Sequence, residues 1–400
     1  MIHCVNLATL RNSPYPTQDY RVNQDDCCNI NPSSIIMLVN IRVGKGIVMK
    51  RIFLLVMIAM STAAAELAQE FDETSTWTWA YTKKFSSQEL KSIKQRAHLV
   101  FSKTDIAQFT QLIFSWNAFR PEKGHYAFHA QVRDATSKEW GAWHKMMEWG
   151  ANVQRSFTSK IGDWTQYFHV RLETGTQRLA DGFRLKIEIV NGADFSQFRG
   201  FSVSVSDFTK FNSEIGAKGS DSWPSIHLGG VPQKSQMLLE HPRCGDMCSP
   251  TSSSMLTSYL LMQYVDPLDF AQKAYDSGLN AYGSWPFNTA HAFERCNGTF
   301  YFSTRRFASF AALLQHLKQD IPVVVSVRGY LRGAPKAYPK GHLLVVVGFD
   351  AQTREVICHD PAFHGDENIK IRYPLDVFLA AWERSHRLAY VAEPASILSS

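Results

Sequence analysis

The stretch that most constrains the fold of this chain is residues 243–261. A Cys-Gly-Asp turn opens it, and from Met255 onwards apolar residues recur at helical spacing. Pro250 fits the first turn of a helix, where a missing N–H costs nothing. Cys248 is therefore expected at or just before a helix N-terminus, where free N–H groups and the helix dipole lower a thiol pKa. By itself, the stretch fits an activated thiol and a structural cysteine, either buried or in a disulfide, about equally well.

A nucleophilic cysteine needs a base, and the base needs a group that orients it. Downstream, residues 340–350 and 355–361 contain two apolar runs that are typical of strands, with a polar turn between them. Folding this hairpin about residues 351–352 brings His342 opposite Asp360, or within a residue or two of it. Directly paired residues have Cβ atoms about 4.5–5.5 Å apart, which suits an imidazole held by a carboxylate. A lone His is usually a solvated or capping residue, but the paired Asp and the upstream Cys favour a catalytic role here.

Three segments carry a family signal, in the order Cys, His, Asp: 248–252 (Cys-Ser-Pro-Thr-Ser), 341–348 (Gly-His-Leu-Leu-Val-Val-Val-Gly) and 359–361 (His-Asp-Pro). Residues 284–290 and 321–327 add further matches. Over about residues 225 to 395 the chain resembles cysteine peptidase family 39 in its "like" branch. These proteins are relatives of the peptidase domain that trims double-glycine leaders from bacteriocins, with a papain-like fold. The resemblance implies that Cys248 is the nucleophile, His342 the general base and acid, and Asp360 the orienting residue.

The family also places a Gln upstream of the Cys, and its side-chain amide helps to bind the oxyanion. Gln233 and Gln236 are the two candidates. The Ser-Gln pair that precedes the Cys segment is the closer match, so the resemblance favours Gln236. Its distance from Cys248 in the sequence is longer than in papain, and an exposed loop Gln without a role is the alternative.

The N-terminal 65 residues are expected to lie outside the folded protein. Residues 1–48 show no periodicity and are rich in Asn, Asp and Ser. Residues 49–65 combine a basic start, a nine-residue apolar core and an Ala-Ala-Ala cleavage site, the pattern of a secretory signal peptide. We therefore expect Met49 to be the true start, residues 1–48 to be a disordered gene-model extension, and the secreted or periplasmic protein to begin near Glu66. A membrane-anchoring helix is the alternative, although the apolar run is too short to span a bilayer stably.

Charge and cysteine content limit the classes of partner and site. The formal net charge is +6, and residues 1–51, with six basic and three acidic residues, hold half of it. This low net charge, together with the lack of a basic run interleaved with aromatic residues, argues against a nucleic-acid partner. A free Cys248 leaves Cys244, Cys296 and Cys358 in the exported part, so at most one pair can form, and Cys244 with Cys296 is the expected one. A zinc site lacks paired ligand spacing, and no cofactor or metal is expected.

Residues 66–222 are predicted to form an antiparallel β-sandwich-like domain. After a helical segment over 87–100, short alternating runs such as 125–133 and 182–189 follow one another with turn signals between them. Seven of the ten Trp residues lie in this region. They could line a carbohydrate-binding face, but filling of a small core is the favoured interpretation. A cell-surface or carbohydrate ligand remains a hypothesis.

Residues 223–400 are predicted to form the papain-like domain, after a linker over 210–226. Helices come first and an antiparallel sheet follows, an α+β arrangement. Trp285 is expected on a loop that leads into a short helix, as a groove wall or a core plug. The Gly- and Pro-rich loop 329–341 is either a wall of the cleft or a simple connection, and His359 and His364 are expected at the surface.

Together these features predict an exported cysteine peptidase that cleaves peptide or protein substrates through a covalent thioacyl intermediate. Two alternatives stay open. One is a papain-like amidase or acyltransferase that acts on the cell wall. The other is a surface-binding protein whose peptidase domain is catalytically silent.

Overall fold

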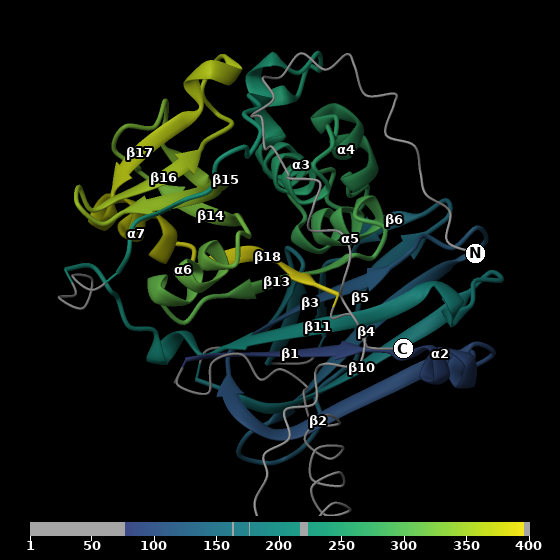
Figure 1. Ribbon diagram of the computed structural model, residues 1–400. Coiled ribbons are helices and arrows are strands. Elements are labelled where there is room, and N and C mark those ends of the chain that lie inside the picture. Colours follow the sequence, from purple (N-terminus) through teal and green to yellow (C-terminus); the bar gives the residue numbers. More distant parts are fainter. Residues whose placement is uncertain (1–76, 162–163, 176, 217–222, 396–400) are drawn as a thin grey trace, which may run out of the picture. The chain divides into compact units, whose positions relative to one another are not determined.

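The computed structural model describes residues 77–161, 164–175, 177–216 and 223–395. Within these ranges the protein is a mixed α/β structure with three antiparallel sheets and six α-helices. All of them belong to one compact unit, Ala63–Ser400. The expected extension 1–48 and signal peptide 49–65 lie outside the described residues. Figure 1 shows the β-rich first part of this unit and the mixed C-terminal part.

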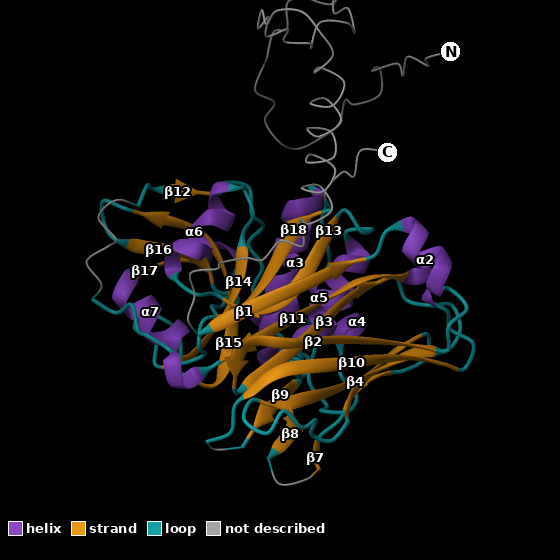
Figure 2. Cartoon of the chain, turned by 90° about the horizontal axis from the view of Figure 1, so that it is seen from below, coloured by secondary structure: helices purple, strands orange, loops and turns teal. Residues whose placement is uncertain are grey.

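The β-rich part consists of two antiparallel sheets, both visible in Figure 2. The six-stranded sheet contains, in spatial order, β1 (Thr78–Lys84), β11 (Phe198–Ser206), β3 (Gln111–Ala118), β9 (Arg171–Thr174), β8 (Thr165–Phe168) and β7 (Ser159–Ile161). The five-stranded sheet contains β2 (His98–Phe109), β10 (Ala180–Val190), β4 (His125–Asp134), β5 (His144–Gly150) and β6 (Gln154–Ser156).

Both sheets contribute aromatic side chains to one apolar cluster. The Phe128 ring of β4 lies 4.5 Å from Trp116 and 5.1 Å from Phe114 of β3, centroid to centroid. On β10, buried residues alternate with partly exposed ones such as Arg184, the period-2 pattern of a strand with one wet face. Of the seven Trp residues, three are buried (Trp77, Trp116 and Trp149) and four are partly buried with a Lys or Arg over the ring (Trp79, Trp140, Trp143 and Trp164).

The helix expected over 87–100 is shorter in the structure. Helix α2 spans Ser87–Ile93 and begins with a capping box, in which Ser86 and Glu89 satisfy each other's backbone N–H groups. Residues from His98 onwards belong to strand β2 instead. Alternating inward residues such as Phe101 pack on the apolar cluster, and tertiary packing therefore decides the conformation there.

The C-terminal part contains a seven-stranded sheet and five helices. The strands are, in spatial order, β13 (Phe300–Arg306), β18 (Leu388–Pro394), β14 (Val323–Gly329), β15 (Tyr338–Asp350), β16 (Glu355–His359) and β17 (Lys370–Pro374), and β12 (Ile226–His227) pairs with β15. The helices are α3 (Cys248–Leu261), α4 (Pro267–Ala274), α5 (Trp285–Arg295), α6 (Phe310–Lys318) and α7 (Leu375–Glu383). Helices α3, α4 and α5 lie together on one side of strands β15, β16 and β17 (Figure 1).

The two parts share a packed and hydrogen-bonded seam. The buried Asn117 side chain of β3 donates to the carbonyl of Phe302 on β13 at 2.9 Å and accepts from its N–H at 2.7 Å. Phe287 of α5 is fully buried against Trp116, with ring centroids 5.6 Å apart. Burying both partners of an amide pair and a large ring fixes the C-terminal sheet and α5 on the β-rich part.

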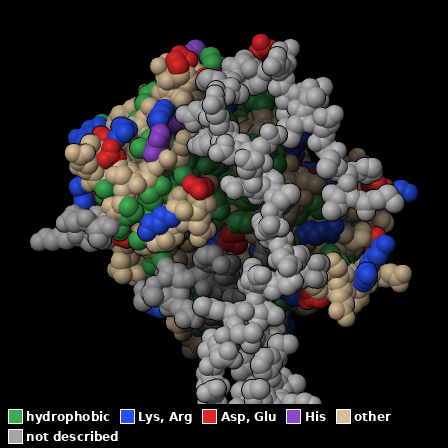
Figure 3. Space-filling model, viewed as in Figure 1, with side chains coloured by type: hydrophobic (Ala, Val, Ile, Leu, Met, Phe, Trp, Pro, Cys, Tyr) green, Lys and Arg blue, Asp and Glu red, His purple; other side chains and the backbone are tan. Residues whose placement is uncertain are grey.

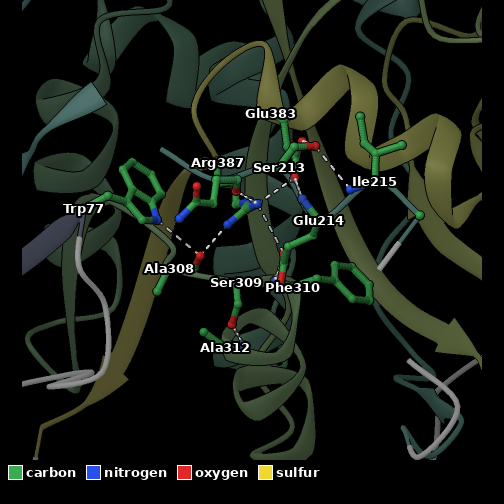
Figure 4. A network of polar contacts seen from close by, with 12 residues as sticks. Trp77, Ser213, Glu214, Ile215, Ala308, Ser309, Phe310, Ala312, Glu383 and Arg387 are labelled. Atoms are coloured by element: carbon green, nitrogen blue, oxygen red, sulfur yellow. Dashed lines mark hydrogen bonds and ion pairs between the residues drawn. The ribbon is translucent and has the colours of Figure 1, made fainter. Parts of the chain in front are cut away.

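A second set of contacts at the seam surrounds Arg387, which is 1% exposed (Figure 4). Its guanidinium lies 2.6 Å from Glu383 Oε1 and 3.5 Å from Glu214 Oε2, and it donates to the carbonyl of Ala308. The Trp77 indole N–H donates to the same carbonyl at 3.3 Å. At the start of the predicted linker, the Ser213 hydroxyl and the Glu214 N–H donate to the Glu383 carboxylate at the end of α7.

Candidate active site

Cys248 is the first residue of α3, directly after a short 3-10 turn over Cys244–Asp246. Small polar residues continue the helix, and several of their hydroxyls form hydrogen bonds. Ser252 donates to the carbonyl of Leu343 on β15 at 3.0 Å, and Ser249 bonds the Tyr390 hydroxyl at 2.8 Å. The start of α3 is thereby held against the strand that carries His342, and Cys248 as a residue is partly exposed.

The Cys248 thiol is hydrogen bonded with the His342 side chain and with the backbone N–H of Leu343. Burial alone would raise the pKa of the Cys248 thiol. The charge of His342 and these hydrogen bonds outweigh burial, so the pKa is lowered below the ordinary thiol value. A thiol with a lowered pKa beside an imidazole is the arrangement of an activated cysteine nucleophile.

His342 lies on β15 and is buried, with its ring stacked on Tyr338 at 4.0 Å between centroids. Its Nε2 is 2.7 Å from Asp360 Oδ1, which leaves Nδ1 as the nitrogen for the thiol. Burial alone would lower the pKa of His342. The charges of Asp360 and of the Cys248 thiolate overcome this effect and raise the pKa to about 10. The imidazole therefore carries a proton that it can donate.

Asp360 is fully buried, and both of its oxygens accept hydrogen bonds. Besides His342, Oδ1 accepts the backbone N–H of Ala362 at 3.0 Å. Oδ2 accepts the hydroxyls of Tyr338 at 3.0 Å and Tyr373 at 2.9 Å. Burial raises the pKa of Asp360, but the charge of His342 and these donors outweigh it, so the pKa is lowered. The carboxylate is thus kept ionised although it is buried.

The two tyrosines were not identified from the sequence. Tyr338 lies four residues before His342 on the same strand, and this even spacing puts two side chains on one face, a weak signal that was available. Tyr373 comes from β17, where Ile357 of β16 faces Arg372 and Val356 faces Tyr373. No local pattern links Tyr373 to Asp360, because their contact depends on how the chain turns after β16.

The hairpin has the turn expected between its strands, with Asp350 facing Glu355. A register shift between Val346 and Gly348 makes Val345 face His359. By extrapolation of this register Asp360 faces Leu344, two residues from His342. The hydrogen bond forms because Asp360 lies just beyond the end of β16 and can turn toward the imidazole.

Gln236 lies in a 3-10 turn over Gln236–Leu238 and is 1% exposed. Its Nε2 donates to the carbonyl of Cys244 at 2.9 Å, and its backbone N–H donates to Pro361, next to Asp360, at 2.9 Å. The Gln236 Oε1 has no hydrogen-bond partner among the described residues. Gln236 is therefore not an exposed loop residue. It joins the turn before Cys248 to the segment after β16, with one amide hydrogen of Nε2 left over.

Three other expectations are wrong. The four cysteines in the described ranges are all free, so Cys244 and Cys296 are not paired. Cys296 ends α5 inside the apolar core, whereas Cys244 is partly exposed on the turn before α3. His359 is buried, with Nδ1 3.1 Å from the Pro232 carbonyl, and burial lowers its pKa to about 4. Trp285 begins α5 instead of lying on a loop, because Pro286 suits the first turn of a helix.

No metal site accompanies this cluster. Among the described residues, no three or more His, Cys, Asp or Glu side chains are grouped so that they could hold a metal ion. Within the same ranges, no helix is both long and apolar enough to cross a bilayer.

The comparison with known families agrees with the motifs around this site. Residues 229–390 match the Peptidase_C39 like family. No curated protein matches the chain. The matched stretch includes all the residues that carry the resemblance in the sequence, from Gln236 to Asp360. The chain is therefore similar to the Peptidase_C39 like family over residues 229–390.

Proposed function

We propose that this protein is an exported cysteine peptidase that hydrolyses peptide bonds through Cys248, His342 and Asp360. The family match of residues 229–390 supports a peptidase. The observation that carries the proposal is the continuous contact from the Cys248 thiol through His342 to the buried Asp360 carboxylate. An ion pair of thiolate and imidazolium supplies both a nucleophile and a proton donor before substrate binds.

In the first step, the Cys248 sulfur attacks the carbonyl carbon of the scissile peptide bond. The C–N bond then breaks as His342 gives its proton to the leaving amine, and a thioester forms. His342 next takes a proton from water, whose oxygen attacks the thioester and releases the acid. The Cys248 thiolate and the protonated His342 are thereby restored.

Gln236 is proposed to help bind the oxyanion of each tetrahedral intermediate. One hydrogen of its Nε2 is used by the Cys244 carbonyl, and the other is available for an oxyanion at the start of α3. The backbone N–H groups at a helix N-terminus add favourable dipoles at the same place.

For the rest of the chain, we propose that residues 66–222 form a β-sandwich built from the two sheets of the β-rich part, that the peptidase domain begins at 223, and that residues 49–65 direct export. The shared aromatic cluster of the two sheets supports the first proposal. The basic start, apolar core and Ala-rich end of 49–65 support the last.

The test compares purified wild-type protein with Cys248→Ala and Cys244→Ala on unfolded protein and on murein fragments. Cys248→Ala is expected to lose at least about a thousandfold in kcat/KM on protein while it remains folded, because removing a nucleophile disables the whole catalytic unit. Cys244→Ala should retain activity, since the Cys244 side chain takes no part in the chemistry. Full activity of Cys248→Ala would refute the mechanism, and cleavage of murein fragments alone would favour an amidase.

A further inference from the structure

A cavity of about 770 Å³ lies at the seam between the β-rich part and the C-terminal sheet. Its volume is in the range of pockets that bind ligands of moderate size, about 300–1,000 Å³. Strand β9 and the segment before it form one wall, and β14, β15 and the end of α7 contribute the other. Gly341, the residue before His342, lines the cavity, as does Trp285 at the start of α5. The cavity therefore reaches the backbone next to the proposed general base.

The charged residues that line this cavity are mostly cationic. Five are positive (Arg171, Arg306, Arg328, Lys340 and Arg384), and only Glu173 is negative. The lining His169 and His386 are neutral at pH 7, because burial and neighbouring arginines lower the pKa of both groups. On the face drawn in Figure 3, by contrast, basic and acidic side chains are interspersed. The positive bias of the cavity lining is therefore not shared by the described residues visible on that face.

Arg306 is the most constrained of these cations. It is 7% exposed, its Nη2 donates to Gln111 Oε1 at 2.7 Å, and its Nη1 donates to the carbonyl of His386 at 2.9 Å. Its Nε has no hydrogen-bond partner, and no carboxylate of the described residues forms an ion pair with it. Burial, with Arg171 nearby, lowers the pKa of Arg306 to about 9, although the charge of Glu173 acts in the opposite direction. A buried guanidinium without a counter-ion is costly unless a ligand supplies the negative charge.

Two of the remaining cations, Arg328 and Arg384, are held by backbone carbonyls. Arg384 donates through Nε to the Arg328 carbonyl at 2.6 Å, and Arg328 donates through Nε to the Pro339 carbonyl at 3.1 Å. Carbonyl partners orient a guanidinium but do not neutralise it. Arg171 is the exception, since its Nε lies 2.6 Å from Glu173 Oε1.

We propose that this cavity is a substrate subsite that selects peptides with acidic side chains close to the scissile bond. This inference rests on the proposed function, since it takes the occupant to be the peptide presented to Cys248. Aspartate and glutamate side chains fit the chemistry of the lining, because a short apolar stem can contact rings such as Trp285 while the carboxylate meets a guanidinium. An extended peptide that enters beside Gly341 carries its side chains past Lys340 and Arg328.

The test measures binding separately from turnover. Fluorescence anisotropy on the Cys248→Ala protein compares a labelled peptide that carries two Glu residues with the same peptide that carries Gln at both positions. The acidic peptide is expected to bind about tenfold more tightly, as one charge-assisted bond provides. The preference should shrink as salt is raised, because exposed charges are screened. Equal affinity for the two peptides would overturn the proposal.

Variants made in the same Cys248→Ala background locate the effect. Lys340→Gln, Arg328→Gln and Arg306→Gln should each weaken binding of the acidic peptide several-fold and leave the Gln peptide unchanged. Lys336→Gln is the matched control, because Lys336 is exposed on the same loop and does not line the cavity. An equal loss from Lys336→Gln would overturn the proposal. So would displacement of the peptide by polyglucuronate at a lower carboxylate concentration, since the occupant would then be an acidic polysaccharide.

Hydrolysis by the wild-type protein separates this inference from the proposed function. A higher kcat/KM for the acidic peptide supports both. Hydrolysis of both peptides at equal kcat/KM supports the peptidase and contradicts the subsite. Selective binding without hydrolysis of either peptide supports an acidic-peptide site and contradicts the peptidase.

Discussion

Asp360 and Arg306 are both buried ionised side chains, but they differ in how far their charge is balanced by neighbouring groups. Asp360 is surrounded by donors from three elements and by the imidazole of His342. Arg306 donates to carbonyl oxygens and an amide oxygen, lies over an aromatic ring and forms no ion pair among the described residues. A satisfied buried charge is held rigidly in one position, which a catalytic group needs. A buried charge without an ion-pair partner can be neutralised by a charged ligand. With the functions proposed above, the difference separates a group used for chemistry from a group used for binding.

The largest loss of unfolding free energy should follow from removing the Asp360 carboxylate. Asp360→Ala leaves the His342 imidazolium and two tyrosine hydroxyls without their acceptor, and should lower the free energy of unfolding by about 3–5 kcal/mol. Urea denaturation measures this change. Glu367→Ala removes an exposed carboxylate from the same segment and should cost less than about 0.5 kcal/mol. Similar losses for the two variants would show that Asp360 is not a satisfied buried charge.

A smaller effect is expected from removing single donors. Tyr373→Phe and Tyr338→Phe each keep the ring but delete one hydrogen bond to the Asp360 carboxylate, which should cost about 2 kcal/mol of unfolding free energy. Tyr264→Phe is the matched control, because the Tyr264 hydroxyl donates at 3.1 Å to Asp266 but the residue is 59% exposed. If the control loses as much stability as the buried variants, burial of Asp360 does not strengthen its hydrogen bonds.

The pH dependence of stability offers a test of the ion pair, with the sign fixed by proton counts. In the unfolded chain between about pH 6.5 and 8.5, His342 is neutral and Cys248 is a thiol, so the pair holds one proton. The folded pair also holds one proton, on the imidazole, because the His342 pKa is raised and the Cys248 pKa is lowered. The unfolding free energy should therefore be flat with pH in this window.

Cys248→Ala should make the folded and unfolded chains differ in the number of protons that they bind. The Cys248 thiolate no longer raises the pKa of His342 in this variant, but the Asp360 charge and hydrogen bond still do. If Asp360 keeps a proton on His342 that the unfolded chain has lost, stability should fall by up to about 1.4 kcal/mol per pH unit above pH 6.5. This loss continues as the pH rises toward the folded pKa of His342. Urea melts from pH 6 to 9 give both profiles. Parallel profiles for wild type and variant would contradict the thiolate–imidazolium pair.

The smallest change in unfolding free energy should come from replacing Arg306, which forms no ion pair with any described residue. Arg306→Gln removes a buried cation that has no counter-ion, so the unfolding free energy should change by less than about 1 kcal/mol or even rise. The same substitution at Arg387, which is buried between Glu383 and Glu214, should cost about 3–5 kcal/mol. Equal losses at the two arginines would show that Arg306 is also a structural cation.

The sequence predicted the features that depend on local pattern. The start of α3 at Cys248 follows from Pro250 and the preceding turn, and the hairpin that carries His342 and Asp360 follows from two apolar runs around a polar turn. The prediction of a helix beyond Ile93 was wrong, because alternating apolar side chains of β2 pack on an apolar cluster that is distant in the sequence.

Features that depend on the meeting of distant segments were not predictable from local pattern. The hydrogen bond of Tyr373 to Asp360 joins β17 to the end of β16 through an irregular turn. The cationic cavity collects its residues from Arg171 to Arg384, and no part of the sequence contains more than a few of them. The mild net charge of the chain conceals this local concentration.

The central claim, that Cys248 is held as a thiolate by His342, is tested most directly by its alkylation rate as a function of pH. Iodoacetamide reacts with the thiolate, and mass spectrometry can follow the peptide that contains Cys248. The account predicts a second-order rate constant that stays constant between about pH 6 and 8 in the wild type and rises with pH in His342→Ala. A wild-type rate that rises about tenfold per pH unit, as for an ordinary thiol, would contradict it.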